Sequence, residues 1–246
     1  MRSIFVLAFG VATAFTSLAQ QPVTVYLAGD STCANKAIGK RPETGWGEML
    51  QQYFDPAKVK VVNEAQNGRS TKSFIGEGRW RSIVDRLKKG DWVFVGFGHN
   101  DEKKDKPAIY ASPEDYKANL VRFIKETRAK GATPVLLTPV SRRKFENDIL
   151  VKTHGEYPDA VKTVGREQDV AVIDMESKSA SVLTRYGTEG SRKLFLQLKP
   201  GESSNYPNGV EDNTHFNPKG AGEMAALAVE GIREDRLKLG KYLKKK

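Results

Sequence analysis

The feature that most constrains the fold is a repeated order of apolar runs, polar segments and helical patterns. Apolar residues recur at helical spacing between the runs, as in residues 112–131. Parallel strands need crossover connections of this kind, which are usually helices. The sequence therefore predicts one α/β domain in which helices cover both faces of a parallel sheet of about five strands. The strand-like runs are residues 23–29, 58–63, 92–97, 133–138 and 170–174.

The amino terminus has the pattern of a secretory signal. Arg2 supplies the positive start, residues 4–15 are mostly apolar, and residues 17–19 offer small side chains for cleavage. No later run approaches the roughly 20 apolar residues that a spanning helix needs. We therefore expect a signal peptide over residues 1–19 and one mature domain over residues 20–246, exported to the periplasm or the cell exterior, with no membrane partner.

The charge balance favours anionic partners. Lys and Arg number 40 against 30 for Asp and Glu, which gives a formal net charge of +10. Nucleic acid, acidic lipid and acidic polysaccharide all match such a charge. The basic residues are spread along the chain, and no nucleic-acid-binding motif accompanies them. We therefore expect no nucleic-acid partner.

Ser31 is the candidate nucleophile. It stands at the end of the first apolar run, in Gly29-Asp30-Ser31, and open α/β sheets bind ligands at the carboxyl ends of their strands. The alternative is that Ser31 or Asp30 only caps the following turn. The lone Cys33, two residues on, is a rival nucleophile, but small buried cysteines usually pack and a single thiol forms no intramolecular disulfide.

A serine hydroxyl needs a base, and the base needs a partner that fixes its tautomer. Asp212 and His215 supply both groups within one polar segment, just before a helix that Asn217-Pro218 opens. We expect His215 to take the proton of Ser31 and Asp212 to hold the other side of the imidazole. An Asp three residues before a His also occurs by chance, so the pair alone is weak evidence.

Ester attack creates an oxyanion that needs hydrogen-bond donors. Gly68 offers an unobstructed backbone N–H, Asn100 carries an amide donor, and the N–H of Ser31 would be the third. Each of these segments follows a predicted strand. Alternatively, Gly68 and Asn100 are ordinary turn residues.

Four sequence blocks together resemble those of the SGNH (GDSL-type) hydrolases. They are Gly29-Asp-Ser-Thr32, Gly68 within Asn67-Gly-Arg-Ser70, Gly98-His-Asn-Asp101, and Asp212-Asn-Thr-His215 with the residues to Gly220. The residues within these blocks are similar to those of the rhamnogalacturonan acetylesterase branch. The resemblance implies a flavodoxin-like three-layer α/β/α sandwich. It also implies Ser31, Asp212 and His215 as catalytic residues, and an oxyanion hole from Ser31, Gly68 and Asn100.

The same resemblance implies removal of O-acetyl groups from pectic polysaccharide without a cofactor. The expected partner is therefore an acetylated acidic polysaccharide or oligosaccharide. Three alternatives stay open: a lipase-like activity, a thioesterase activity, and a non-catalytic module that binds acidic polysaccharide. The sequence does not identify the sugar position or the oligomeric state.

Two other histidines and four basic residues lie outside the expected catalytic set. We expect structural support from His99 and a surface position for His154, and no metal site, because the three histidines lack ligand spacing. Four basic residues fall in segments at or near the predicted active edge. They form either ordinary solvated charge or a cationic rim for uronate carboxylates: Arg69, Arg142, Arg143 and Lys144.

Overall fold

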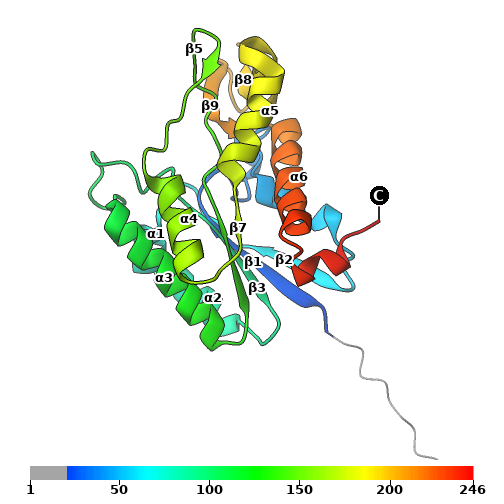
Figure 1. Cartoon of the computed structure of the whole chain (residues 1–246). Coiled ribbons are helices and arrows are strands. Elements are labelled where there is room, and N and C mark those ends of the chain that lie inside the picture. Colours follow the sequence, from blue (N-terminus) through cyan, green and yellow to red (C-terminus); the bar gives the residue numbers. More distant parts are fainter. Residues whose placement is uncertain (1–20, 246) are drawn as a thin grey trace, which may run out of the picture.

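Five parallel strands form the central sheet of the computed structural model, which describes residues 21–245 (Figure 1). The strand order is β2–β1–β3–β4–β7, the doubly wound order typical of flavodoxin-like folds. The predicted fold class is confirmed, whereas the predicted signal at residues 1–19 lies outside the described residues. The strands are β1 (Val23–Gly29), β2 (Val59–Asn63), β3 (Trp92–Gly96), β4 (Thr133–Leu137) and β7 (Val172–Ile173).

Alternate residues of each strand enter two separate hydrophobic cores. In β1, Val25 and Leu27 contribute to one core, whereas Tyr26 and Ala28 contribute to the other. Successive side chains of a strand point to opposite faces, so a strand that is apolar throughout must be covered on both sides. This is why the run at β3 is apolar throughout, whereas β2, at the edge of the sheet, contains an exposed Lys60.

Helices cover both faces (Figure 1). A first group of four helices contributes side chains to the core that contains Tyr26. A second group of three contributes side chains to the core that contains Leu27. The first group is α1 (Thr71–Gly76), α2 (Arg79–Arg86), α3 (Pro113–Ala129) and α4 (Tyr157–Glu167). The second is the 3₁₀ helix η2 (Trp46–Tyr53), α5 (Met175–Gly190) and α6 (Pro218–Glu234).

Two long helices begin as their sequences predict. The Ser112 hydroxyl accepts a hydrogen bond from the N–H of Asp115 at 3.1 Å, and Pro113 occupies the first turn of α3. The Asn217 side chain likewise accepts from the N–H of Gly220 at 3.1 Å, at the start of α6. The cap at Asn217 fixes the chain two residues after His215.

Two antiparallel ribbons lie in segments for which the sequence predicts no strand. They are β5 (Phe145–Glu146) with β6 (Ile149–Leu150), and β8 (Phe195–Leu198) with β9 (Val210–Phe216). Most of β9 is polar and only partly buried. Strand β8 buries Phe195 and Leu196 but has only four residues, so the ribbon carries no long apolar pattern.

Cys33 packs in the core beside the strand-to-helix turn. Its side chain is buried, and burial raises the pKa of the thiol well above its ordinary value. A Cβ added at Gly47 would lie 2.7 Å from the Cys33 Sγ, and one at Gly45 would lie 2.1 Å from the carbonyl oxygen of Ala34. The two glycines around Trp46 therefore let η2 approach this turn closely. The packing role expected for Cys33 fits this position.

No helix within residues 21–245 combines the length and apolarity that crossing a bilayer requires.

Candidate active site

The predicted catalytic segments meet at the carboxyl edge of the sheet. Ser31 follows β1, Gly68 follows β2, and Asn100 follows β3, while His215 lies on β9. Strand β1 lies between β2 and β3, so chain connections leave it in opposite directions along the sheet. Open α/β sheets bind ligands at this kind of switch point.

Three of the predicted residues form one hydrogen-bonded row. The Ser31 Oγ lies 2.8 Å from the His215 Nε2, and the His215 Nδ1 lies 2.7 Å from the Asp212 Oδ2. Ser31 is 184 positions from His215 in the sequence, so only the fold brings them together. Asp212 and His215 lie on strand β9 rather than in a loop, which corrects the expected local structure.

The environment of Asp212 keeps its carboxylate charged. Partial burial acts to raise its pKa, but hydrogen bonds from His215 and Thr214 outweigh burial and lower it. The Oδ1 accepts the backbone N–H groups of Thr214 at 2.7 Å and His215 at 2.9 Å. A charged Oδ2 requires His215 to donate from Nδ1, which leaves the Nε2 lone pair free to accept the Ser31 proton.

Each predicted oxyanion donor has an N–H hydrogen that is available to an oxyanion. Within residues 21–245, no acceptor receives the N–H of Ser31 or Gly68. Gly68 has a φ of +74°, in the left-handed region that favours glycine. The Asn100 Nδ2 donates to the carbonyl of Arg69 at 3.0 Å and keeps its second hydrogen.

Asp30 stabilises the turn that carries Ser31. Its Oδ1 accepts from the Thr32 N–H at 2.9 Å and from the Thr32 hydroxyl at 2.8 Å. Burial raises the pKa of Asp30, against the effect of these two bonds. Its carboxylate is therefore engaged locally and does not join the row of Ser31 and His215.

His154 is buried, and the surface position expected for it is wrong. Its Nε2 lies 2.9 Å from the carbonyl of Val140, and its Nδ1 lies 3.0 Å from the Glu102 Oε2. Its ring packs edge-to-face on His99, with 4.5 Å between the ring centroids. Neither ring nitrogen of His99 has a hydrogen-bond partner among the described residues, and burial lowers the pKa of His99 well below its ordinary value. The two buried rings pack on each other, which fits the expected structural role of His99.

The four basic residues considered as a cationic rim all contact this chain's own groups. Arg69 pairs with Glu77, Arg142 with Glu102, and Lys144 with Glu146, whereas Arg143 donates to Asn213. Arg143 is also only 9% exposed. These contacts do not support the idea of a rim built from free cations. The hydrogen bond to Asn213 places Arg143 beside the strand that carries Asp212 and His215.

Sequence reasoning missed Lys36 and Asp101. The Lys36 ammonium contacts the Ser31 carbonyl, the Asn67 Oδ1 at 2.8 Å and Glu43 at 2.7 Å. Asp101 accepts from the N–H and hydroxyl of Thr71 and is fully buried. No motif in the sequence marks Lys36, although two of its partners, Ser31 and Glu43, lie within seven positions of it. Asp101 was part of a recognised block but was given no role.

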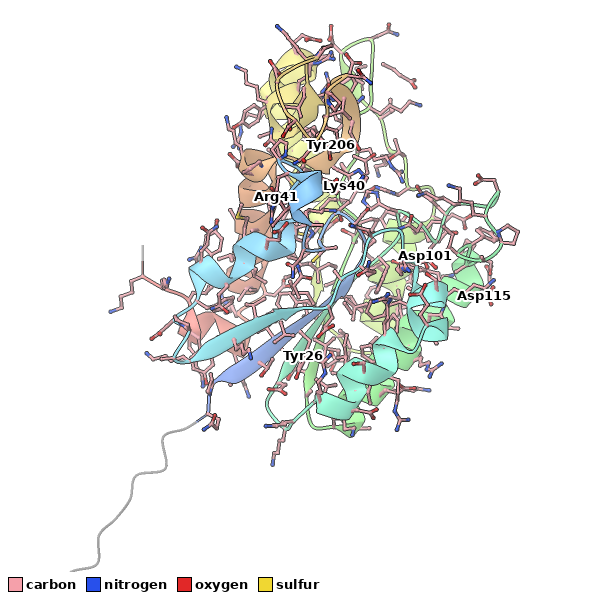
Figure 2. The ribbon with its side chains drawn as sticks, turned by 180° about the vertical axis from the view of Figure 1, so that it is seen from behind. Tyr26, Lys40, Arg41, Asp101, Asp115 and Tyr206 are labelled. Carbon is pink, nitrogen blue, oxygen red and sulfur yellow. The ribbon has the colours of Figure 1, made fainter. Side chains whose placement is uncertain are left out.

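Two loops join to form a wall next to the strand that carries His215. The Asn205 side chain donates to the carbonyl of Arg41 at 2.8 Å, and the Tyr206 hydroxyl donates to the carbonyl of Lys40 at 3.0 Å. Figure 2 shows Tyr206 beside Lys40 and Arg41. The N–H of Thr44 donates to the carbonyl of Phe216, which anchors this wall to β9. The loop between Ser31 and η2 is therefore held by the polar segment that precedes β9.

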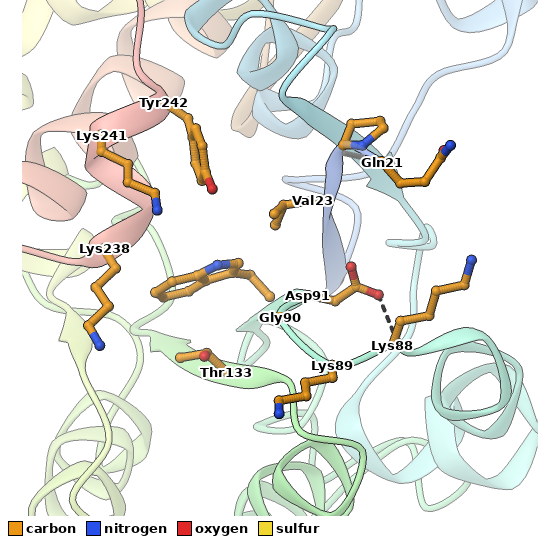
Figure 3. Close-up of a pocket in the computed structure, with 12 residues that line it drawn as sticks. Gln21, Val23, Lys88, Lys89, Gly90, Asp91, Thr133, Lys238, Lys241 and Tyr242 are labelled. Atoms are coloured by element: carbon orange, nitrogen blue, oxygen red, sulfur yellow. Dashed lines mark hydrogen bonds between the residues drawn. The ribbon is translucent and has the colours of Figure 1, made fainter. Parts of the chain in front are cut away.

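A separate cavity of about 510 Å³ lies at the opposite edge of the sheet (Figure 3). It is lined by the amino ends of β1, β3 and β4 and by the last 3₁₀ helix, η4 (Lys238–Tyr242). Trp92 and Tyr242 supply its aromatic surface, with lysines around them. It contains none of the residues predicted for catalysis. Within residues 21–245, no cluster of three or more His, Cys, Asp or Glu side chains is arranged to hold a metal ion.

Comparison with known proteins identifies the family. The profile of the GDSL-like lipase/acylhydrolase family matches residues 27–222. The chain is 43% identical to the rhamnogalacturonan acetylesterase RhgT of Bacillus subtilis over 91% of this chain and 95% of that protein. It is also 27% identical to a rhamnogalacturonan acetylesterase of Emericella nidulans over 89% of this chain and 90% of that protein. The chain belongs to the GDSL-like lipase/acylhydrolase family, and the predictions of this family and of an ester hydrolase are confirmed.

Solved structures agree on the fold. The protein YxiM of Bacillus subtilis superimposes with a TM-score of 0.76 at 26% identity, over 89% of this chain and 58% of that one. The acetylxylan esterase Axe2 of Geobacillus stearothermophilus superimposes with a TM-score of 0.61 at 20% identity, over 87% of this chain and 95% of that one. The second likeness concerns the fold alone.

Proposed function

We propose that this protein is an exported serine esterase that removes O-acetyl groups from an acidic pectic polysaccharide of the rhamnogalacturonan type. The observation that carries the proposal is the row of Ser31, His215 and Asp212, with distances of 2.8 and 2.7 Å between successive partners. The names of the related acetylesterases support the substrate class. The signal-like residues 1–19 support export.

The proposed reaction proceeds in two halves. The Ser31 Oγ attacks the acetyl carbonyl while the His215 Nε2 takes the hydroxyl proton, and Asp212 stabilises the resulting imidazolium. The tetrahedral oxyanion receives hydrogen bonds from the N–H groups of Ser31 and Gly68 and from the Asn100 side chain. Collapse of this intermediate breaks the ester bond, and His215 gives its proton to the departing sugar oxygen. The product of this half is an acetylated Ser31.

Water completes the cycle. His215 takes a proton from a water molecule, whose oxygen attacks the acetyl group on Ser31. A second oxyanion forms at the same donors and collapses to acetate, while His215 returns the proton to the Ser31 Oγ. No step requires a cofactor, since base, nucleophile and donors all come from the chain.

Acetate release from acetylated rhamnogalacturonan tests the proposal. We expect the wild type to release acetate and Ser31→Ala to lose all but a residual activity, roughly 10³-fold or more below the wild type. Ser181→Ala, at an exposed position of α5, is the matched control and should keep full activity. Wild-type rates on Ser31→Ala would refute the mechanism. A preference for long acyl chains in a series of nitrophenyl esters would instead indicate a lipase.

A further inference from the structure

Two of the proposed oxyanion donors belong to amide groups whose oxygen atoms accept a hydrogen bond from a cation. The Arg69 Nη1 lies 2.8 Å from the Asn67 carbonyl oxygen, which shares a peptide unit with the N–H of Gly68. The Lys103 Nζ lies 2.7 Å from the Asn100 Oδ1, which shares an amide with the Nδ2 donor. In both amides, the oxygen faces a positive charge while the nitrogen keeps a hydrogen for the oxyanion.

This arrangement strengthens the donors. Amide resonance shifts electron density from nitrogen to oxygen, and a cation at the oxygen increases that shift. The N–H then becomes more positive and a better donor to a developing oxyanion. Removing one donor aimed at an oxyanion costs about 10²–10³-fold in kcat in acyl transfer.

Lys103 also fixes the orientation of the Asn100 side chain. An ammonium group only donates, so it can face the Oδ1 but not the Nδ2. On the other side, the Nδ2 donates to the Arg69 carbonyl at 3.0 Å, which would repel an amide oxygen turned toward it. A flipped Asn100 would therefore lose both bonds, and the amide hydrogen stays directed along the active edge.

Lys36 connects these donors to the nucleophile. Its three ammonium hydrogens match three acceptors: the Ser31 carbonyl, the Asn67 Oδ1 and Glu43. Its side chain is only 1% exposed, so the contacts are shielded from water. The turn after β1 and the loop after β2 are thus joined by one buried cation.

We propose that Lys103 and Arg69 are positioning residues of ester hydrolysis, each polarising an oxyanion donor through the oxygen of the same amide. Lys36 fixes the position of the turn that carries Ser31 relative to the loop that carries Asn67, and so keeps the donors in place. The inference rests on the proposed function, because it assumes that Gly68 and Asn100 serve an oxyanion. In this role the two cations act through the oxyanion donors and not through contact with the substrate.

The variant Lys103→Met tests the inference, since it keeps the aliphatic stem and removes the ammonium. We expect kcat to fall about tenfold, less than the 10²–10³-fold loss on deleting a donor itself. KM should stay within about twofold, because the donor acts on the transition state more than on the bound ester. Lys103→Arg should restore most of kcat. Lys104→Met is the matched control, because Lys104 is exposed and its side chain has no partner among the described residues.

A second pair of variants separates polarisation from the surface ion pair of Arg69. Arg69→Met removes the cation from the Asn67 carbonyl, whereas Glu77→Gln removes the partner of Arg69 and leaves the guanidinium in place. We expect a several-fold loss of kcat for Arg69→Met and none for Glu77→Gln. Thermal midpoints of all variants should lie close to that of the wild type. An equal loss in both variants would overturn the role of Arg69.

Labelling of Ser31 by a fluorophosphonate provides a readout that does not depend on the natural ester. Phosphonylation passes through a charged oxygen at the same donors, so Lys103→Met should slow it by the same factor as kcat. Unchanged labelling and unchanged kcat in Lys103→Met would overturn the inference. If the wild type labels but releases no acetate, the proposed substrate is wrong and labelling alone decides the inference. A wild type that does not label would refute both.

Discussion

Asp101 lies directly after Asn100, with one carboxylate oxygen bonded and the other without a partner among the described residues. Burial raises its pKa to about 7, although the bonds from Thr71 act in the opposite direction. An unfolded aspartate has a pKa of about 3.9. Between these values the folded protein binds a proton that the unfolded chain does not, so stability falls as the pH rises.

We therefore predict that Asp101→Asn flattens the pH dependence of stability. The free energy of unfolding of the wild type, taken relative to Asp101→Asn, should fall by up to about 1.4 kcal/mol per pH unit between about pH 5 and 7. Chemical denaturation at a series of pH values measures this difference. Asp105→Asn, at an exposed position of the following turn, is the control and should keep the wild-type slope. Parallel profiles for wild type and Asp101→Asn would contradict the prediction.

Single residues also mark the limit of what the sequence reveals. Ser31, Asp212 and His215 could be proposed because their types and motif context suit nucleophilic chemistry. His154 could not be placed, since burial depends on Glu102 and Val140, which precede it by 52 and 14 positions. For Lys36, the contact with Asn67, 31 positions away, is the one that the sequence could not indicate. Contacts between distant segments decide whether such a polar residue is solvated or structural.

Strand β9 carries the proposed base, His215, and its partner Asp212 outside the main sheet. Hydrogen bonds from Arg143 connect β9 to the segment after β4. Its backbone N–H donates to the Asn213 carbonyl at 2.8 Å, and its Nη1 donates to the Asn213 side chain at 2.9 Å. Asn213 stands next to Asp212, so the guanidinium supports the strand that orients His215.

We predict that Arg143→Met lowers kcat about tenfold and destabilises the fold by about 1 to 3 kcal/mol. The buried hydrogen bonds to charged groups account for the stability loss, and looser placement of His215 accounts for the activity loss. Lys144→Met is the control, because Lys144 is exposed and pairs only with Glu146. Steady-state kinetics and thermal unfolding measure the two effects. An Arg143→Met enzyme with wild-type kcat would show that β9 needs no such support.

Elements were predictable in proportion to the apolar surface that they bury. The five sheet strands and helices α3 and α6 were predicted, with bounds that differ by a few residues. Helix α1 and the two ribbons were missed. Helix α1 and the ribbon of β5 and β6 are too short to show a period, strand β9 is mostly polar, and apolar β8 has only four residues.

The net positive charge of the whole molecule should attract an acidic polymer before the two make contact. The formal net charge is +10, and the cations are distributed rather than gathered at a free rim. We predict that KM for an acetylated acidic polysaccharide rises several-fold between about 0.01 and 0.15 M salt, as the Debye length falls from about 30 to 8 Å.

A small neutral acetate ester is the internal control for that measurement. Its KM should not change with salt, because no long-range attraction draws it to the enzyme. Equal salt responses for polymer and neutral ester would point to an effect of salt on the enzyme itself and would contradict electrostatic attraction of the substrate.

The solitary thiol at Cys33 has a practical consequence. Because it is enclosed and has no second cysteine to join, chain assembly involves no oxidative step and no reshuffling of cross-links. The same native state is accessible in reducing cytosol and in oxidising surroundings. Recombinant protein can therefore be produced in an ordinary bacterial cytoplasm and assayed in the presence of thiol reagents.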